Sequence, residues 1–600
     1  MSGELPRDEI KREYSQRLEA RRAVVARLER REARVANARL VVFAALPIVA
    51  WLAFVAERIS GWWLIPPAFL FAFLVWWHER SRRAIHGAAR ATVFYEKGLA
   101  RLDDRWAGTG EPGLRFLDTE HPYSADLDLF GAGSLFERLC TARTRSGEDR
   151  LASWLLGPAP IDVIVARQAA VEELRPRLDL RESLDLLGDD VRAGVDPDAL
   201  AKWGRTPRSG IHRLMRAFAV ALTVLAIVAT LFWAFRSEGG TLFLIVLTAE
   251  IVFVLATRRR VAETFAGLEL RTHDLVLLAS LLETLERESF QAEALTSVRS
   301  ALQTEGIPAS QAIAHLGRLV QQLSMMKNQF FAPFGFVVLW PFHFAIAIDR
   351  WRARFGPAIG GWLLAIGEFE SLGALASYAF ENPGDSFPEL VAEGAWYQAE
   401  SLGHPLIPLS SCVRNDIALG GETRVALISG SNMSGKSTLL RAVGVNAVLA
   451  LAGAPVRARK LRLSRLAIGA TLRIQDSLQA GRSRFYAEIT RIRQVVDLAG
   501  GPIPLLFLLD EILHGTNSHD RRIGAESIVR GLIDRGAIGL VTTHDLALTE
   551  FADELAPRGL NVHFEDHFEN GTMCFDYVMR PGVVRKSNAL ALMRAVGLDV

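Results

Sequence analysis

Four long apolar runs, arranged as two pairs, constrain the fold of this 600-residue chain more than any other feature. Five residues separate the runs within each pair, and the runs are 17, 16, 19 and 17 residues long: Leu40–Ala56, Trp62–Trp77, Ala217–Phe235 and Thr241–Thr257. A helix of about 20 residues crosses the ~30 Å hydrocarbon layer of a bilayer, so each run lies at the short edge of a membrane span. The runs also explain a mean hydropathy of +0.18, which is high for a soluble enzyme. The chain is therefore predicted to contain two helical hairpins.

Basic residues flank the outer ends of both pairs: Arg30, Arg31, Arg34 and Arg39, then Arg80, Arg82 and Arg83, then Arg205, Arg208, Arg213 and Arg216, then Arg258, Arg259 and Arg260. The connecting segments, ERISG and RSEGG, carry fewer basic residues. This asymmetry favours two membrane hairpins with every long segment on the cytoplasmic side. The alternative is a pair of buried helical hairpins in a soluble protein. Glu250, inside the fourth run, favours that alternative, because a carboxylate at the bilayer centre costs about 2.5–3.5 kcal/mol.

Two other segments have simpler interpretations. The apolar stretch Phe330–Ile348 contains Pro333, Pro341 and His343, and we expect it to be protein core rather than membrane. The first 39 residues contain 11 Lys/Arg and 7 Asp/Glu with both signs mixed. They fit either a solvated or partner-binding helix or an arm that touches phosphates of lipid or nucleic acid.

Charge and cysteine content exclude several classes of protein. The 69 Lys and Arg residues nearly balance the 67 Asp and Glu residues, which excludes a nucleic-acid-binding polycation or an acidic disordered chain as a description of the whole molecule. The three cysteines, Cys140, Cys412 and Cys574, are too few and too scattered for a disulfide framework or a zinc cluster. They indicate a reducing compartment.

The most specific motif is GSNMSGKST, which matches the phosphate-loop pattern GxxxxGK[ST]. An apolar strand (Val425–Ile428) precedes it and a helical pattern follows it, as the motif requires. Its backbone N–H groups and the helix N-terminus can surround a phosphate. Lys436 is expected to reach the outer phosphates and Ser437 to bind magnesium. The predicted ATP-binding residues are Gly430, Ser431, Asn432, Met433, Ser434, Gly435, Lys436, Ser437 and Thr438.

Two further apolar strands end in polar residues that suit phosphate chemistry. The segment PLLFLLDE ends in Asp510 and Glu511. We expect Asp510 to hold the magnesium ion and Glu511 to act as the general base that polarises the attacking water. The segment IGLVTTHD places His544 where a sensor of the γ-phosphate is expected.

Together these blocks resemble the MutS family of DNA mismatch-repair ATPases. The phosphate loop keeps the family's Asn-Met pair, and DEILHGTNSHD and Thr543-His544 follow in the family's order. Gly481, Arg482 and Ser483 resemble the family's signature loop, which implies that they complete the active site of an opposite subunit. The segments Leu129–Pro176 and Glu381–Pro408 resemble the family's helical core and the region before its ATPase domain.

Departures from the family pattern are also informative. Ser431 and Ser434 stand where the family usually has Pro and Gly, and Leu513-His514 replace an expected Gly-Arg. Nothing before Leu129 resembles the mismatch-reading domain. Phe94-Tyr95-Glu96 has the F-x-E form of its reading element, but we interpret it as part of an amphipathic helix beside the membrane. The second hairpin falls where the family would place its DNA clamp.

The sequence therefore predicts a mixed fold: an α-helical core with two transmembrane hairpins and a C-terminal α/β P-loop ATPase domain of the ABC type. The expected segments are a basic helical segment (1–39), hairpin 1 (40–77), the first part of the core (78–210), hairpin 2 (211–260), the second part of the core (261–400) and the ATPase domain (401–600).

The resemblance implies an ATP hydrolase that uses ATP and Mg²⁺ and works as a homodimer with composite sites. We expect a multi-pass protein of the inner cell membrane with its ATPase domain in the cytoplasm. Its partners are then the lipid bilayer and DNA, whose structure or damage it would sense. The alternative is a membrane scaffolding or remodelling ATPase that no longer binds DNA. A transporter motor is a weaker third hypothesis, because four short helices make a poor substrate pathway.

Overall fold

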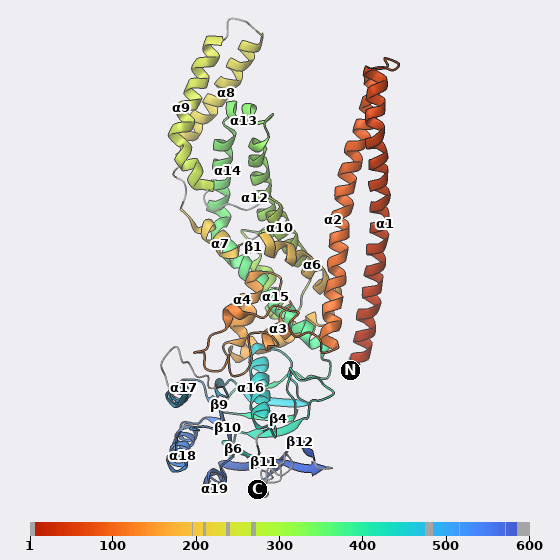
Figure 1. Cartoon of the computed structure of the whole chain (residues 1–600). Coiled ribbons are helices and arrows are strands. Elements are labelled where there is room, and N and C mark those ends of the chain that lie inside the picture. Colours follow the sequence, from red (N-terminus) through yellow and green to blue (C-terminus); the bar gives the residue numbers. More distant parts are fainter. Residues whose placement is uncertain are drawn as a thin grey trace. The chain divides into compact units, whose positions relative to one another are not determined.

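In the computed structural model, helices form the first two thirds of the chain, and β-sheets with helices form the last third (Figure 1). The structure describes residues 6–194, 196–207, 210, 212–235, 240–265, 272–431, 433–473, 484–514, 516–569 and 572–584. The chain divides into two units, one of residues 1–110 with 380–384 and one of residues 111–379 with 385–600.

The first unit is a long antiparallel pair of helices, α1 (Arg7–Phe54) and α2 (Ile65–Leu102), joined through a short 3₁₀ turn (Gly61–Leu64). The basic N-terminal segment and the first apolar run thus form one continuous helix (Figure 1). Phe94-Tyr95-Glu96 lies within α2, as the helical interpretation of that segment expected.

A small polar and aromatic core closes the open end of this helix pair. Tyr14 stacks on Phe380 at a ring separation of 5.7 Å and meets Tyr95 edge-on at 5.8 Å. Arg101 donates to the buried carboxylate of Glu381 from Nε at 2.8 Å and from Nη2 at 2.6 Å. An ionic hydrogen bond away from water is strong, so Arg101 fixes the start of segment 380–384 against α2.

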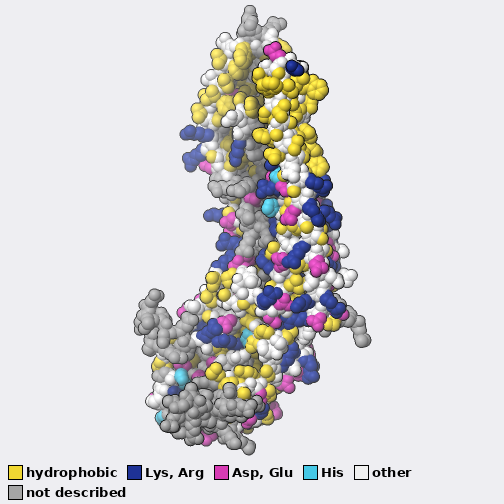
Figure 2. Space-filling model, turned by 45° about the vertical axis from the view of Figure 1, so that its right-hand side comes forward, with side chains coloured by type: hydrophobic (Ala, Val, Ile, Leu, Met, Phe, Trp, Pro, Cys, Tyr) yellow, Lys and Arg dark blue, Asp and Glu magenta, His cyan; other side chains and the backbone are white. Residues whose placement is uncertain are grey.

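The other end of the helix pair exposes its apolar side chains. In the candidate membrane spans Arg7–Phe54 and Gly61–Leu102, none of the most apolar window is buried. Figure 2 shows these hydrophobic side chains gathered near the connecting turn, with Lys and Arg side chains along the rest of the hairpin. The exposed large side chains include Leu40, Phe43, Trp51, Phe54, Trp62, Trp63, Phe69 and Trp76. Apolar surface of this extent requires a lipid or protein neighbour.

The helical part of the second unit contains thirteen helices, α3 to α15, among the residues that the structure describes: α3 (Leu135–Leu139), α4 (Arg145–Leu155), α5 (Ile161–Leu174), α6 (Leu178–Gly194), α7 (Pro197–Arg205), α8 (Arg213–Phe235), α9 (Gly240–Phe265), α10 (Thr272–Arg287), α11 (Glu293–Ala301), α12 (Ala309–Ser324), α13 (Ala332–Val337), α14 (Trp340–Phe355) and α15 (Ile359–Glu381). Strands β1 (Gln303–Thr304) and β2 (Ile307–Pro308) form a small hairpin. The last two residues of α15 belong to the first unit.

Helices α8 and α9 form the second predicted hairpin and pack against α14. The buried side of α8 consists of Leu222 and three small residues, Ala219, Ala226 and Ala229, and the small residues allow close approach of the neighbouring helices. Glu250 of α9 is 1% exposed, so its carboxylate does not face outward. Only 22% and 17% of the most apolar windows of α8 and α9 are buried, so their outer faces are exposed.

By length and composition, five helical stretches among the described residues could cross a membrane. The fifth, Trp340–Glu381, has 72% of its most apolar window buried inside the protein. The expectation of protein core for Phe330–Ile348 agrees with the structure only from Leu339 onward, because Phe330 and Phe334 are exposed. These two side chains precede the buried face of α14 and do not reach it.

The C-terminal part contains two sheets. A six-stranded sheet has the order β12-β11-β6-β10-β9-β8, with all neighbours parallel except the β11–β12 pair. A four-stranded sheet has the order β3-β7-β4-β5. The elements are β3 (Glu389–Val391), β4 (Tyr397–Leu402), β5 (Asn415–Leu419), β6 (Val425–Ser429), α16 (Lys436–Ala452), β7 (Lys460–Ser464), β8 (Ala467–Thr471), α17 (Arg484–Leu498), β9 (Leu505–Asp510), α18 (Ser518–Asp534), β10 (Ile538–Thr543), α19 (Leu546–Glu554), β11 (Gly559–Glu569) and β12 (Thr572–Pro581).

The helical part and the sheets share one hydrophobic core, and α16 packs against both α4 and α5. Asp126 strengthens this connection: its carboxylate accepts hydrogen bonds from the backbone N–H groups of Leu472 and Arg473 and from Arg491, at 2.7–2.8 Å. A movement of the sheet is therefore transmitted directly to the segment that precedes α3.

The predicted mixed fold, with a helical part and a C-terminal α/β part, is confirmed. Four exposed apolar helices occur where the two hairpins were expected. Their insertion in a membrane and the six expected segment boundaries stay predictions. The structure divides the chain differently, since the first unit runs from the N-terminus to residue 110 and includes residues 380–384.

Candidate functional site

Three neighbouring parallel strands, β6, β10 and β9, bring the sequence-predicted motifs to one edge of the six-stranded sheet. Their residues are almost entirely apolar and buried, as is typical of central parallel strands. In the register, Ser429 pairs with Thr543, and Thr542 pairs with Asp510. The phosphate loop, Glu511 and His544 therefore all follow the carboxyl ends of adjacent strands, where ligands of open α/β sheets bind.

The phosphate loop connects β6 to α16. Gly435, directly before the helix, has φ +103°, a conformation in which a side chain would be strained, and a Cβ there would lie 3.1 Å from the Tyr577 ring. The hydroxyl oxygens of Ser431 and Ser434 are buried without a hydrogen-bond partner among the described residues. Both hydroxyls could donate to a phosphate, so the two departures from the family pattern keep the loop suited to an anion.

Lys436 lies at the first position of α16 and is 5% exposed. Its Nζ donates to the carbonyl oxygens of Gly430 at 2.9 Å and Ser431 at 2.8 Å and lies 3.8 Å from Glu511 Oε1. Burial lowers the pKa of Lys436, whereas the nearby carboxylates of Glu511 and Asp510 act to raise it. A phosphate that replaced these carbonyl partners would provide the ammonium group with a full opposite charge.

One threonine, which the sequence analysis did not single out, connects Asp510, the predicted magnesium ligand, to Glu511, the predicted general base. The Thr542 hydroxyl donates to Asp510 Oδ1 and accepts a hydrogen bond from the backbone N–H of Glu511 at 3.0 Å. Glu511 itself has φ +46°, an uncommon conformation for a residue with a side chain. These contacts fix the turn that directs Glu511 toward Lys436. The signal that identifies Thr542 is the strand register, in which Thr542 of β10 pairs with Asp510 of β9.

His544 lies beside Glu511, with its Nδ1 3.6 Å from Glu511 Oε1. A second histidine, His514, lies near the other oxygen of the same carboxylate, with its Nε2 4.0 Å from Glu511 Oε2. The two imidazole rings meet edge-on at a centroid distance of 5.0 Å. The sequence analysis identified His514 only as a departure from the family and did not place it in the site.

A pocket of about 510 Å³ lies over the phosphate loop. One side contains Lys436, Ser437, Thr438 and Glu511, and the other side comes from the connection between β4 and β5, which the sequence analysis did not predict. Its lining includes His404, Ile407, Cys412 and Val413. A mixed polar and apolar wall opposite a phosphate-binding loop has the composition needed for the base and sugar of a nucleotide.

Buried hydrogen bonds hold this second wall in place. Asn446 of α16 is fully buried, and its amide donates to the carbonyl oxygens of Gly403 at 2.9 Å and Ala442 at 2.7 Å. Its carbonyl oxygen accepts from the backbone N–H of Arg457 at 2.7 Å. The helix that carries Lys436 therefore also positions the residue before His404.

Some predicted residues lie outside the described residues. These are Asn432 of the phosphate loop and the signature-loop residues Gly481, Arg482 and Ser483. Met433, by contrast, is described and is 82% exposed at the mouth of the pocket.

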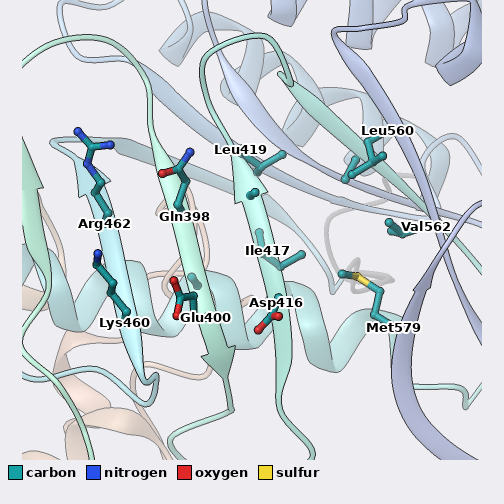
Figure 3. Close-up of a pocket in the computed structure, with 13 residues that line it drawn as sticks. Gln398, Glu400, Asp416, Ile417, Leu419, Lys460, Arg462, Leu560, Val562 and Met579 are labelled. Carbon is teal, nitrogen blue, oxygen red and sulfur yellow. The ribbon is translucent and has the colours of Figure 1, made fainter.

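A second pocket of about 490 Å³ lies between the two sheets (Figure 3). Its wall is formed by charged and polar side chains of β4 and β7, such as Glu400 and Arg462, and by apolar side chains of β11 and β12, such as Leu560 and Met579. Among the residues that the structure describes, no sequence-predicted site residue lines it. The phosphate-loop pocket is therefore the candidate active site.

The residues of the candidate site fit a magnesium ion in their donor chemistry. Ser437 offers a hydroxyl oxygen at the start of α16, and Asp510 offers a carboxylate at the end of β9. Hard oxygen ligands of this kind, completed by phosphate oxygens and water, are those that Mg²⁺ prefers. The arrangement can therefore bind a nucleotide triphosphate with its metal and present a carboxylate to the terminal phosphate.

Comparison with known proteins gives matches in the C-terminal part. The family model of MutS domain V matches residues 426–599. The "DNA mismatch repair protein MutS 2" of Halobacterium salinarum is 34% identical over 38% of this chain and 26% of its own length. The "Endonuclease MutS2" of Thermus thermophilus is 34% identical over 34% of this chain and 27% of its own length. The "Probable DNA mismatch repair protein Msh6" of Drosophila melanogaster is 31% identical over 39% and 20%. The chain thus spans about a quarter of the length of these relatives.

Proposed function

The chain belongs to the MutS family through its C-terminal part, and we propose that it is a membrane-anchored ATPase that senses DNA structure or damage. The observation that carries the proposed activity is the position of Lys436, Asp510, Glu511 and His544 at or just after the carboxyl ends of three adjacent strands. Lys436 and Glu511 line the phosphate-loop pocket, and His544 Nδ1 lies 3.6 Å from Glu511 Oε1. Proteins of this family are ATPases related to DNA mismatch repair, which supports ATP as the nucleotide.

Each residue has a distinct part in the proposed hydrolysis. The phosphate loop and Lys436 bind the β- and γ-phosphates, and Ser437 and Asp510 hold the magnesium ion. The chemistry that this ion supplies is charge neutralisation on the phosphate oxygens. Glu511 accepts a hydrogen bond from the attacking water, and Thr542 keeps the Glu511 backbone in place. His544, next to Glu511, contacts the γ-phosphate and registers its loss.

The proposal includes a homodimer with composite sites, in which Ser483 of one subunit completes the site of the other. ATP binding closes the dimer and hydrolysis opens it. Because Asp126 binds the backbone of Arg473, the segment before the signature loop is tied to the helical part. This contact provides a route by which closure reaches the helices.

Nucleotide binding tests the site assignment directly. In the detergent-solubilised full chain, we expect Lys436→Ala to lose binding of a fluorescent ATP analogue, because the buried ammonium group is the main positive charge at the phosphate position. Lys460→Ala, which removes an exposed lysine of β7, is the matched control and should bind normally. Equal binding by both variants would refute the assignment.

The membrane part of the proposal rests on exposed apolar surface and on flanking charge. The apolar ends of α1, α2, α8 and α9 are largely unburied, and arginines flank them on the side of the long segments. The buried position of Glu250 removes the main objection to insertion, because the carboxylate faces protein rather than lipid. We therefore place the protein in the inner cell membrane as a multi-pass protein with a cytoplasmic ATPase domain.

Cysteine labelling in intact cells tests this topology. In a variant without the three native cysteines, Ser60→Cys lies in the turn between α1 and α2, and a membrane-impermeant maleimide should label it from outside. Ser153→Cys lies on the exposed side of α4 and should be labelled only after the membrane is opened. Labelling of Ser153→Cys and not Ser60→Cys in intact cells would reverse the topology.

DNA as the sensed partner is supported by the relatives' names, which describe DNA mismatch repair. The alternative is a membrane scaffolding or remodelling ATPase that does not bind DNA, and the exposed hairpins favour it. Titration with mismatched, branched and plain duplex DNA at two salt concentrations separates the two. A protein that contacts phosphates loses affinity steeply as salt rises. Absence of binding at low salt, with no effect of DNA on ATP hydrolysis, would favour the alternative.

A further inference from the structure

The turn after β9 presents His514 to the active site through an unusual backbone conformation. Leu513 has φ +60°, yet its side chain is 7% exposed and its backbone N–H donates to the buried carboxylate of Glu488. A Cβ on Gly524 of α18 would lie 2.6 Å from Leu513 Cδ1, so this helix leaves space for the leucine. Leu513, the residue before His514, is thus held by its backbone N–H and by its buried side chain.

His514 completes a cluster of three metal-ligating side chains. One ligand atom from each of Glu511, His514 and His544 lies within 4.8 Å of the other two. The individual approaches to Glu511 are 4.0 Å from His514 and 3.6 Å from His544. We propose that these three side chains bind one divalent transition-metal ion, for which Zn²⁺ is the best-fitting occupant.

The geometry requires only small movements of the side chains. Zinc bonds of about 2.1 Å in a tetrahedron separate neighbouring ligand atoms by about 3.4 Å, so the present distances shorten by roughly 1.5 Å at most. The three side chains are 26%, 44% and 43% exposed, in the order Glu511, His514 and His544, which leaves them room to move. Water can occupy the fourth position. Two imidazoles and one carboxylate form a ligand set that selects zinc over magnesium.

Three cationic side chains oppose a metal ion here: Lys436, and Arg521 and Arg522, which line the same small pocket as the three ligands. Lys436 Nζ approaches Glu511 Oε1 at 3.8 Å, the oxygen that His544 also approaches, whereas the contact with His514 involves Oε2. Two hydrogen bonds to loop carbonyls hold Nζ on the phosphate-loop side. The proposed zinc position is also distinct from the magnesium position, which uses the oxygen ligands of Ser437 and Asp510.

Zinc at this position switches off hydrolysis while leaving the phosphate loop available. It occupies the general base and the γ-phosphate sensor, so ATP binds but the attacking water has no acceptor for its proton. This consequence rests on the proposed function, whereas binding of the metal does not.

Metal binding is tested on the nucleotide-free, detergent-solubilised full chain. We expect Zn²⁺ to bind with one ion per chain by calorimetry, and Co²⁺ to give the visible absorption of a four- or five-coordinate site with nitrogen ligands. Removing one of the three protein ligands in His514→Ala should weaken binding at least about tenfold, given that even outer contacts of metal ligands are worth this much. His519→Ala, which removes an exposed histidine of α18, is the matched control and should bind like the wild type. Binding by His514→Ala as tight as by the wild type would overturn the site.

Hydrolysis in the presence of Mg²⁺ and added Zn²⁺ tests the consequence. Zn²⁺ should inhibit the wild type, and His514→Arg, which installs the residue expected from the family, should hydrolyse ATP and need at least about tenfold more Zn²⁺ for the same inhibition. Equal sensitivity of both proteins would overturn the inhibitory role. A wild type that binds Co²⁺ but has no ATPase activity would leave the metal site standing and refute the proposed function instead.

Discussion

A buried ion pair at the junction of the helical part and the sheets gives a quantitative prediction. Arg457 and Asp385 are each 3% exposed, and Arg457 Nε donates to both carboxylate oxygens, at 2.8 and 3.1 Å. Tyr378 of α15 donates to the same carboxylate at 2.8 Å. The backbone N–H of Arg457 also binds Asn446, which positions the pocket wall. The pair therefore connects α15 to the candidate active site.

Arg457→Met keeps most of the side-chain volume and leaves Asp385 buried with the neutral Tyr378 donor. Breaking a buried pair in this way costs about 3–5 kcal/mol. We therefore expect a loss of about 3–5 kcal/mol in the free energy of unfolding.

Denaturant unfolding of the detergent-solubilised chain, followed by its intrinsic fluorescence, measures this loss. The double variant Arg457→Met with Asp385→Leu should recover part of the stability, because no buried charge is left. A single variant within 1 kcal/mol of the wild type, or a double variant that loses as much as the sum of both single variants, would refute the reasoning.

Two further predictions concern the sheet and its neighbouring pocket. At Gly539 of β10, a Cβ would lie 2.2 Å from the carbonyl oxygen of Phe507, so Gly539→Ala should lower the free energy of unfolding by about 1–3 kcal/mol. Gly531→Ala, in open space on α18, should raise it by about 0.5–1 kcal/mol. Thermal unfolding of both variants checks this, and equal effects would contradict it. Burial, assisted by the charges of Arg441 and Arg457, lowers the pKa of His404 to about 4, below the ~6.5 of a histidine in the unfolded chain. The stability that neutral His404 contributes is therefore present above pH 6.5 and is lost as pH falls toward 4. The free energy of unfolding should therefore fall by about 2 kcal/mol less between pH 7 and pH 5 in His404→Gln than in the wild type. Unfolding experiments at both pH values measure this difference. The same fall in both proteins would show that His404 is not buried as the structure has it.

The sequence predicted those parts of the site that depend on local pattern. Lys436, Asp510, Glu511 and His544 each follow a short buried apolar run, and adjacent parallel strands necessarily bring such ends together. The opposite wall of the pocket could not be predicted, because His404 is positioned by the side chain of Asn446, 42 residues away, and hydrogen bonds over such distances leave no periodic pattern.

The helical hairpins illustrate the same distinction between local and distant contacts. Hydrophobic runs predicted where α1, α2, α8 and α9 lie, since their apolar side chains are contiguous in the sequence. The attachment of residues 380–384 to the first helix pair was not predicted. It depends on Arg101 binding Glu381 across 280 residues and on the fit of Tyr14 against Phe380. Likewise, only the backbone angle of Leu513 reveals why His514 faces Glu511.

The central claim, ATP hydrolysis with Glu511 as the general base, is tested most directly by single-turnover hydrolysis of radiolabelled ATP in the detergent-solubilised full chain with Mg²⁺. We expect turnover by the wild type. For Glu511→Gln we expect a rate lower by a factor of about 10²–10⁴, with ATP retained in the protein because binding by Lys436 and the phosphate loop is intact. Hydrolysis by Glu511→Gln at the wild-type rate would contradict the account.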